Sequence, residues 1–170
     1  MANGPILISS QVVSSGGASS ITFSSIPQTY TDLKLVISAR NTDTGGGAIN
    51  LTFNGDSGSN YNLVRLINSN GSLGSGSGST NTLYWIDSND WTANTFGSME
   101  LYIPNYTSSN KKSVSVDAVA ENNSSSAYLQ ALTALLWNNT SAITSIGCAS
   151  AGSTSFMQYS SFYLYGIKNS

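Results

Sequence analysis

Short runs in which apolar and polar residues alternate account for much of this chain. Alternation with a period of two is typical of β-strands that bury one face and expose the other. The clearest runs are Ile21–Phe23, Leu33–Ala39, Leu51–Phe53, Met99–Ile103 and Val114–Ala118. The pattern predicts antiparallel strands, each with one face on a core and one face in water.

The segment Tyr128–Trp137 is the exception, because the spacing of its apolar residues fits a helix as well as a strand. Leu129, Leu132, Leu135 and Leu136 supply both patterns. The Ser and Asn residues on either side favour a strand buried on both faces, and the helix remains the alternative.

Clusters of turn-forming residues divide the chain into about ten such runs, with little or no helix. Gly and Asn favour turns because they adopt positive φ at little cost. The clusters are Gly45–Gly47, Asn54–Gly55, Asn70–Gly78 and Gly152–Ser153. Many short strands in one chain of 170 residues predict an all-β fold, a two-sheet antiparallel β-sandwich of the jelly-roll kind.

The sandwich is expected to be a single domain over residues 17–170, since a chain of this length needs only one core. Residues 1–16 contain Pro5 and the apolar Ile6, Leu7 and Ile8. They form either a first strand or an extended docking arm, in which the three apolar side chains would bury in a groove of another protein.

Composition makes catalysis the weaker hypothesis. The chain has no histidine, one cysteine and 8% charged residues, against ~25% in ordinary globular domains. Relays that need His, and zinc sites built from His and Cys, are excluded. Cys148 lies in an apolar stretch and is expected to be a small buried residue. We expect a protein that is not an enzyme, with no catalytic residues, no metal and no cofactor.

The charge balance also narrows the partners. Six Lys and Arg residues and a net charge of -2 argue against nucleic acid. No apolar run approaches the ~18 residues of a membrane span, and the first basic residue is Lys34, so no secretory leader is expected. Arg40 and Arg65 are expected to be structural, bonding to carbonyl or carboxylate oxygens.

Four blocks of the chain resemble a family of small virion proteins of tailed bacteriophages common in aquatic environments. The blocks are Ile21–Leu33 with Ala39–Thr42, the stretch LTFNGDSGSNY at 51–61, Leu136–Asn138 with Ala142–Ile146, and SFYLYGIK at 161–168. The family has RFNGDSGSNY, LWNSTAAITSI and SxFxLYGIK at the last three. Two positions depart from it, because Leu51 stands where Arg is usual and the Gly/Ser run 71–79 is longer.

This resemblance implies a virion component, described in the family as a capsid decoration or a tail-fibre protein. A decoration (cement) protein needs only a compact domain and a docking segment, which suits this chain. The resemblance implies a homotrimer at local threefold positions, with the major capsid protein as partner. The protein would be made in the host cytoplasm and end up in the virion, with Pro5, Ile6, Leu7 and Ile8 as the docking segment.

The alternative is a tail-fibre or other appendage protein that binds host-surface carbohydrate. Under it, Trp85, Trp91 and Tyr106 are candidates to stack on sugar rings. Asp87 and Asp90 beside Trp91 suggest a glycosidase pair, but an Asx-type turn explains them more simply.

A calcium loop is also conceivable at residues 54–60, which offer oxygen atoms at alternate positions. They contain one carboxylate, Asp56, and Arg65 stands where a bidentate Glu would be needed, so a turn is favoured.

Overall fold

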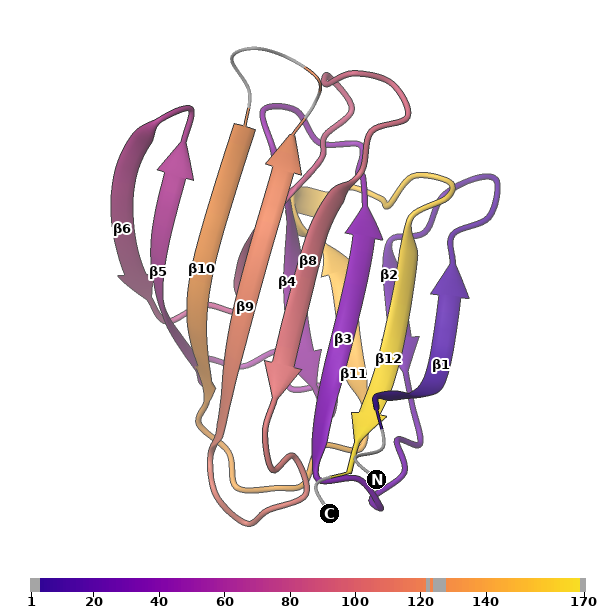
Figure 1. The fold of residues 1–170 in the computed structure, drawn as a ribbon, viewed down its shortest axis with the longest axis vertical. Coiled ribbons are helices and arrows are strands. Elements are labelled where there is room, and N and C mark those ends of the chain that lie inside the picture. The colour runs from indigo at the N-terminus through magenta and orange to yellow at the C-terminus, as the bar shows by residue number, and fades with distance from the viewer. Residues whose placement is uncertain (1–3, 122, 124–127, 169–170) are drawn as a thin grey trace.

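The structure is a computed structural model that describes residues 4–121, 123 and 128–168. In these residues the chain folds into an eight-stranded and a four-stranded antiparallel sheet packed face to face (Figure 1). We call them the large and the small sheet. The predicted all-β sandwich is confirmed.

Twelve strands are present in the described part of the chain, two more than predicted. They are β1 (Ile6–Val12), β2 (Ser20–Phe23), β3 (Asp32–Ala39), β4 (Gly47–Phe53), β5 (Tyr61–Ser69), β6 (Ser72–Gly78), β7 (Thr82–Ile86), β8 (Gly97–Ile103), β9 (Lys112–Glu121), β10 (Tyr128–Trp137), β11 (Ile146–Ser150) and β12 (Ser161–Ile167). One short 3-10 helix, η1 (Ala151–Ser153), precedes β12. No helix within the described ranges has the length and hydrophobicity of a membrane-spanning segment.

The strands pair as a nested series from the two ends of the chain inwards. β1 pairs with β12, β2 with β11, β3 with β8 and β4 with β7. Successive pairs alternate between the large and the small sheet, and the pairs β12–β3 and β11–β4 join them within each sheet. A long antiparallel double strand rolled over a core in this way is the jelly-roll arrangement.

Two hairpins are inserted into this jelly roll. β5–β6 lies between β4 and β7 in the chain, and β9–β10 lies between β8 and β11. Both join the large sheet, which continues beyond β8 in the order β9, β10, β5, β6. The small sheet's edge strand β7 contacts β8, β9 and β10, and β5 and β6 lie further out at the left margin of Figure 1.

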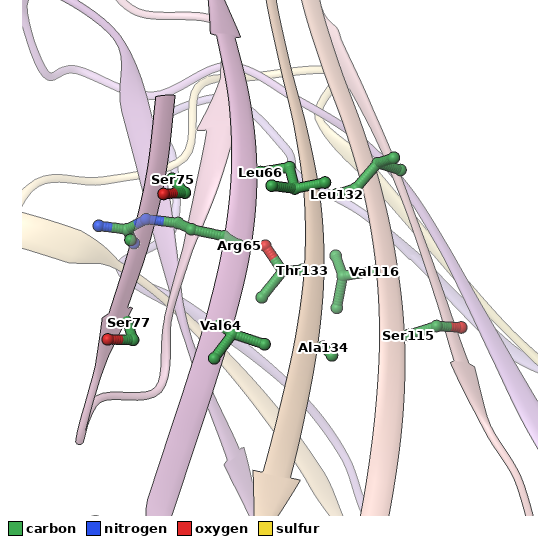
Figure 2. A pocket seen from close by; sticks show the side chains of 11 residues that line it. Val64, Arg65, Leu66, Ser75, Ser77, Ser115, Val116, Leu132, Thr133 and Ala134 are labelled. Carbon is green, nitrogen blue, oxygen red and sulfur yellow. The ribbon is translucent and has the colours of Figure 1, made fainter. Parts of the chain in front are cut away.

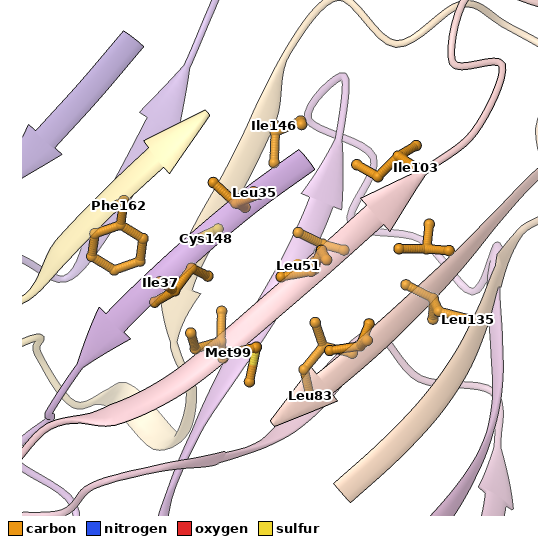
Figure 3. Packing of buried hydrophobic residues seen from close by; sticks show 14 of the residues in the cluster. Leu35, Ile37, Leu51, Leu83, Met99, Ile103, Leu135, Ile146, Cys148 and Phe162 are labelled. Atoms are coloured by element: carbon orange, nitrogen blue, oxygen red, sulfur yellow. The ribbon is translucent and has the colours of Figure 1, made fainter. Parts of the chain in front are cut away.

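The core fills the space between the sheets, and alternate residues of each strand supply it. Leu35, Met99 and Leu51 are fully buried there, from β3, β8 and β4 (Figure 3). Cys148 of β11 lies in the same core, and its burial raises the pKa of the thiol to about 12. A neutral thiol without solvent access is a packing residue, as expected.

Tyr128–Trp137 is a strand, so the helix alternative is wrong. The expectation that both of its faces are buried is wrong as well. Leu129 and Leu135 point into the core, whereas Leu132 lies on the outer face and is 48% exposed. The reason is its position inside the large sheet, where the small sheet covers one face only.

Residues Ile6–Val12 form strand β1 at one edge of the large sheet, so they belong to the sandwich. Of the two alternatives for this segment, the structure has the strand and not the extended arm. Ile6 and Leu7 are exposed, whereas Ile8 is half-buried against the core. Pro5 directly precedes the strand and is exposed.

Candidate functional site

Aliphatic side chains gather on the outer face of the large sheet, over the two inserted hairpins. Because side chains alternate along a strand, the even-numbered residues of β5 and β10 point away from the core. We call the exposed set the outer apolar face. It consists of Val64 (59% exposed), Leu66 (64%), Leu73 (86%), Val119 (44%) and Leu132 (48%).

Strand register brings these residues from distant parts of the sequence together. Leu132 of β10 lies opposite Leu66 of β5, and Ala134 lies opposite Val64. Directly opposed residues on one face of an antiparallel pair have Cβ atoms ~4.5–5.5 Å apart, so their side chains touch. Figure 2 shows Leu66 and Leu132 side by side above the sheet. Val64, Leu66, Leu132 and Ala134 therefore form a continuous aliphatic strip, and Leu73 of β6 lines the same hollow as Leu66 and Leu132.

The outer apolar face is hollowed because small residues stand between the large ones. Ala134, Ser115, Ser75 and Ser77 leave a shallow groove of about 710 Å³ flanked by Val64, Leu66 and Leu132 (Figure 2). Two smaller hollows of about 260 and 290 Å³ adjoin it along β5 and β10. A neutral, concave apolar surface of this kind suits contact with another protein surface.

Arg65, the charged residue in the lining of the groove, is turned away from it (Figure 2). It faces the inner side of the sheet, where its guanidinium carbon lies 4.4 Å from the centre of the Tyr84 ring. Gly76 of β6 lies next to it, and a Cβ there would be 3.2 Å from Arg65 Nε. The glycines of β6 make room for Arg65 on the inside, and the serines face the groove. Arg65 is structural, but its contact is an aromatic ring rather than the predicted oxygen atoms.

Strand β6 also forms a free edge of the large sheet. Its sequence, SLGSGSG, has no charged residue and no proline. Natural sheets commonly protect edges with charges, proline or bulges, because an unprotected edge can pair with another strand. The edge beside the outer apolar face lacks these side-chain protections.

The three aromatic candidates for sugar stacking do not form one surface. Tyr106 is fully buried and its hydroxyl donates a hydrogen bond to the Pro27 carbonyl, so its proposed role in stacking is wrong. Trp85 is half-buried against the core, close to Gly46. Trp91 is half-buried and lines a separate cleft at the end of the sandwich where β3 ends and β8 begins.

Of the two carboxylates beside Trp91, Asp90 holds a turn together and is exposed. Asp87 is fully buried. Asp90 accepts hydrogen bonds from the Gly45 N–H at 3.0 Å and from the Ser88 hydroxyl at 2.6 Å. The Ser88 bond is the main cause that lowers the pKa of Asp90. The two groups do not face a common space as a glycosidase pair would.

Asp56 is likewise occupied by its own loop. It accepts hydrogen bonds from Gly58 N–H, from the Asn60 amide and, at 2.8 Å, from the Trp137 indole N–H. This is the predicted turn, extended by a bond to the end of β10. Within the described residues, no group of three or more His, Cys, Asp or Glu side chains is placed to hold a metal ion.

The apolar residues of Tyr128–Trp137 predict a strand but not the outer surface that it forms. The signal was present, because β5 and β10 carry apolar residues at both odd and even positions. Which of those positions face water depends on sheet order, which a single sequence does not contain.

Comparisons with known protein families, with curated proteins and with solved structures found no match for this chain.

Proposed function

We propose that this protein is a non-catalytic structural subunit of a bacteriophage virion, a capsid decoration protein that associates as a homotrimer. The observation that carries the proposal is the outer apolar face. Monomeric proteins rarely leave a large contiguous aliphatic surface in water, and such surfaces mark interaction sites. The resemblance of the four sequence blocks to phage virion proteins supplies the biological setting.

The chemistry of the outer apolar face favours a second copy of this chain as the partner. The polar residues that line the groove and the hollow beside it are Ser, Thr, Asn and Gln, apart from the inward-facing Arg65. Asp117 of β9 lies next to this lining, opposite Leu132. A neutral surface binds best to another neutral surface, and this chain has only 8% charged residues. The unprotected edge of β6 allows closely spaced copies to add main-chain hydrogen bonds.

The opposite edge of the large sheet is the proposed contact with the major capsid protein. β1 lies at that edge, with Ile6 and Leu7 exposed beside Pro5. Their burial would contribute roughly 1.5–3 kcal/mol for each fully covered side chain. The two proposed contacts therefore lie at opposite margins of one sheet, and one can be tested without disturbing the other.

The test separates the two contacts by a pair of matched variants. The double variant Leu66→Ser/Leu132→Ser is expected to convert a trimer to a monomer in sedimentation velocity at ~20 µM, because burial of both leucines is lost. Leu7→Ser is expected to leave the trimer intact and to weaken binding to heads stripped of this protein.

Circular dichroism and thermal unfolding check that each variant remains folded. A wild-type protein that is monomeric at this concentration and does not bind heads would contradict the proposal. Location of the protein at the tail alone by electron microscopy would favour the appendage alternative instead.

A further inference from the structure

A second hollow lies at one end of the sandwich, apart from the outer apolar face. It has a volume of about 280 Å³ between the β7–β8 loop and the segment that precedes β12. In Figure 1 this is the upper end, where β3 ends and β8 and β12 begin. Its lining combines aromatic side chains with amides, namely Trp91, Phe96 and Tyr159 with Asn89, Asn94 and Gln158. We call it the loop cleft.

Arg40 fixes the first wall of the loop cleft from within. It is buried, and its guanidinium donates hydrogen bonds to the carbonyl oxygens of Thr92 (2.6 Å), Trp91 (2.9 Å) and Asn89 (3.1 Å). These bonds hold the β7–β8 loop around the Arg40 guanidinium. A wall held in this way loses little conformational entropy when a ligand binds.

The main chain of Arg40 fixes the second wall. Its carbonyl accepts hydrogen bonds from the Met157 N–H at 2.8 Å and the Ser160 hydroxyl at 3.1 Å. The Ser160 N–H in turn bonds to the Met157 carbonyl, which closes a tight turn over residues 157–160. Arg40, directly after β3, thus holds both walls by hydrogen bonds, so the shape of the loop cleft is fixed by the fold.

Tyr159, at the tip of that turn, has an unusual backbone. Its φ is +73°, in the left-handed region, and its side chain is 66% exposed. Bulky residues rarely adopt this conformation, for which Gly or Asn is better suited. Packing does not account for a tyrosine here, since the ring is mostly in solvent. Strained residues of this kind cluster at ligand-binding sites.

The lining chemistry points to a neutral, polyhydroxylated ligand. The apolar C–H face of a sugar packs on an aromatic ring, and Asn and Gln amides both donate and accept hydrogen bonds, as hydroxyl groups do. Arg40 is the charged residue of the lining, and its guanidinium is committed to loop carbonyls. The volume lies near the lower limit of ~300 Å³ for small-molecule sites, which suits one or two sugar rings.

We propose that the loop cleft binds a neutral saccharide unit, with Tyr159 and Trp91 as the stacking rings and Asn94 and Gln158 as hydrogen-bonding groups. This goes beyond the decoration function and does not depend on it, because the loop cleft and the outer apolar face share no residue. In a particle that displays many copies, weak sites of this type would act together on a glycan-coated surface.

The experiment is a titration of the whole protein with four neutral oligosaccharides: maltotriose, cellotriose, mannotriose and triacetylchitotriose. Trigalacturonate serves as the acidic comparison. Saturation-transfer NMR detects binding, and Trp fluorescence gives the dissociation constant. At least one neutral trisaccharide is expected to bind, and trigalacturonate is not.

Tyr159→Asn is the decisive variant, because Asn tolerates positive φ and removes only the ring. It is expected to raise the dissociation constant at least tenfold, ~1.4 kcal/mol, while Tm stays the same or rises. Tyr128→Asn removes an exposed tyrosine of β10 outside the loop cleft and is expected to leave binding unchanged.

Three results would overturn the proposal: no binding of any neutral trisaccharide at millimolar concentration, binding of trigalacturonate alone, or unchanged binding by Tyr159→Asn. The variant Leu66→Ser/Leu132→Ser separates this proposal from the function above. It is expected to dissociate the trimer and to bind the trisaccharide with unchanged affinity per chain.

Discussion

The two halves of the large sheet are alike on the inside and opposite on the outside. Over β3 and β8 the outer face carries Lys34 and Glu100, an ion pair at 2.8 Å. Over β5 and β10 the corresponding positions carry Val64, Leu66 and Leu132. Both halves bury aliphatic residues toward the small sheet or its margin.

This difference separates the demands of folding from those of association. The core-facing residues are needed by any jelly roll of this size, and they are apolar along β3, β8, β9 and most of β10. Only the outer face is free to vary. It carries an ion pair over β3 and β8 and exposed aliphatic residues over β5 and β10, a difference that fits the proposed association through the inserted hairpins.

The largest expected effect is the difference between truncating a leucine on the inner face of the large sheet and truncating one on its outer face. Leu35→Ala on β3 is expected to lower the free energy of unfolding by ~2–5 kcal/mol, because it leaves a cavity in the core. Leu132→Ala on β10 is expected to change it by less than ~0.5 kcal/mol. Urea denaturation at one low protein concentration measures both. Equal losses would mean that the outer face is part of the folding core.

Replacing Arg40 and replacing Arg65 are expected to differ in their effect on the free energy of unfolding, by an intermediate amount. Arg40→Met leaves several loop carbonyls without their donor and is expected to cost ~3 kcal/mol. Arg65→Met is expected to change stability by less than ~1 kcal/mol. The Arg65 Nε and Nη1 atoms are buried without a hydrogen-bond partner among the described residues, so Met loses only the contact of the guanidinium with the Tyr84 ring, a contact that contributes ~0.5–1 kcal/mol. Thermal and urea unfolding of both variants test this order, and a larger loss for Arg65→Met would reverse it.

The smallest expected effect is the pH dependence of the stability that Asp56 contributes through its hydrogen bond to Trp137, at the end of β10. Trp137 N–H, with Asn60 and Gly58, lowers the pKa of Asp56 below its ordinary value of 3.8. A lowered folded pKa means that the stabilisation is complete above about pH 4 and is lost as pH falls through the folded pKa. Wild type is therefore expected to have a larger free energy of unfolding than Asp56→Asn at about pH 6, and the difference is expected to shrink toward pH 3. Urea unfolding followed by Trp fluorescence measures it at each pH. Asp117→Asn, at an exposed carboxylate of β9, is the matched control. An advantage that does not change with pH would contradict the assignment.

Strands with one apolar face can be predicted from the sequence alone. β3, β8 and β9 follow directly from alternation, and the jelly roll follows from the number of such runs. The sequence predicts a turn at Asn70–Gly78, whereas Ser72–Gly78 form strand β6. Alternation misses this strand because its inward residues are glycines, which make room for Arg65 and provide no apolar signal.

The candidate sites were less predictable, because they depend on which residues face water. The ring of Tyr106 and the ring of Tyr159 have the same composition, yet one is fully buried and the other is 66% exposed. Alternation does not distinguish them, since neither lies in a strand. The aromatic lining of the loop cleft forms only when the β7–β8 loop and the turn before β12 meet, and these segments are separated by more than a third of the length of the chain.

The nested pairing of the strands also has a consequence for biosynthesis. Among the described strands β1 is made before all others and its partner β12 after them, and β2 must likewise wait for β11 before it can pair. Until then the inner edge of each early strand has no neighbour, and contacts so distant in sequence form slowly. The sandwich therefore closes only after synthesis of β12. During that interval charge repulsion contributes little, since only 8% of the residues are charged, and the abundant Ser, Asn and Gly residues are what keep the unfinished chain in solution.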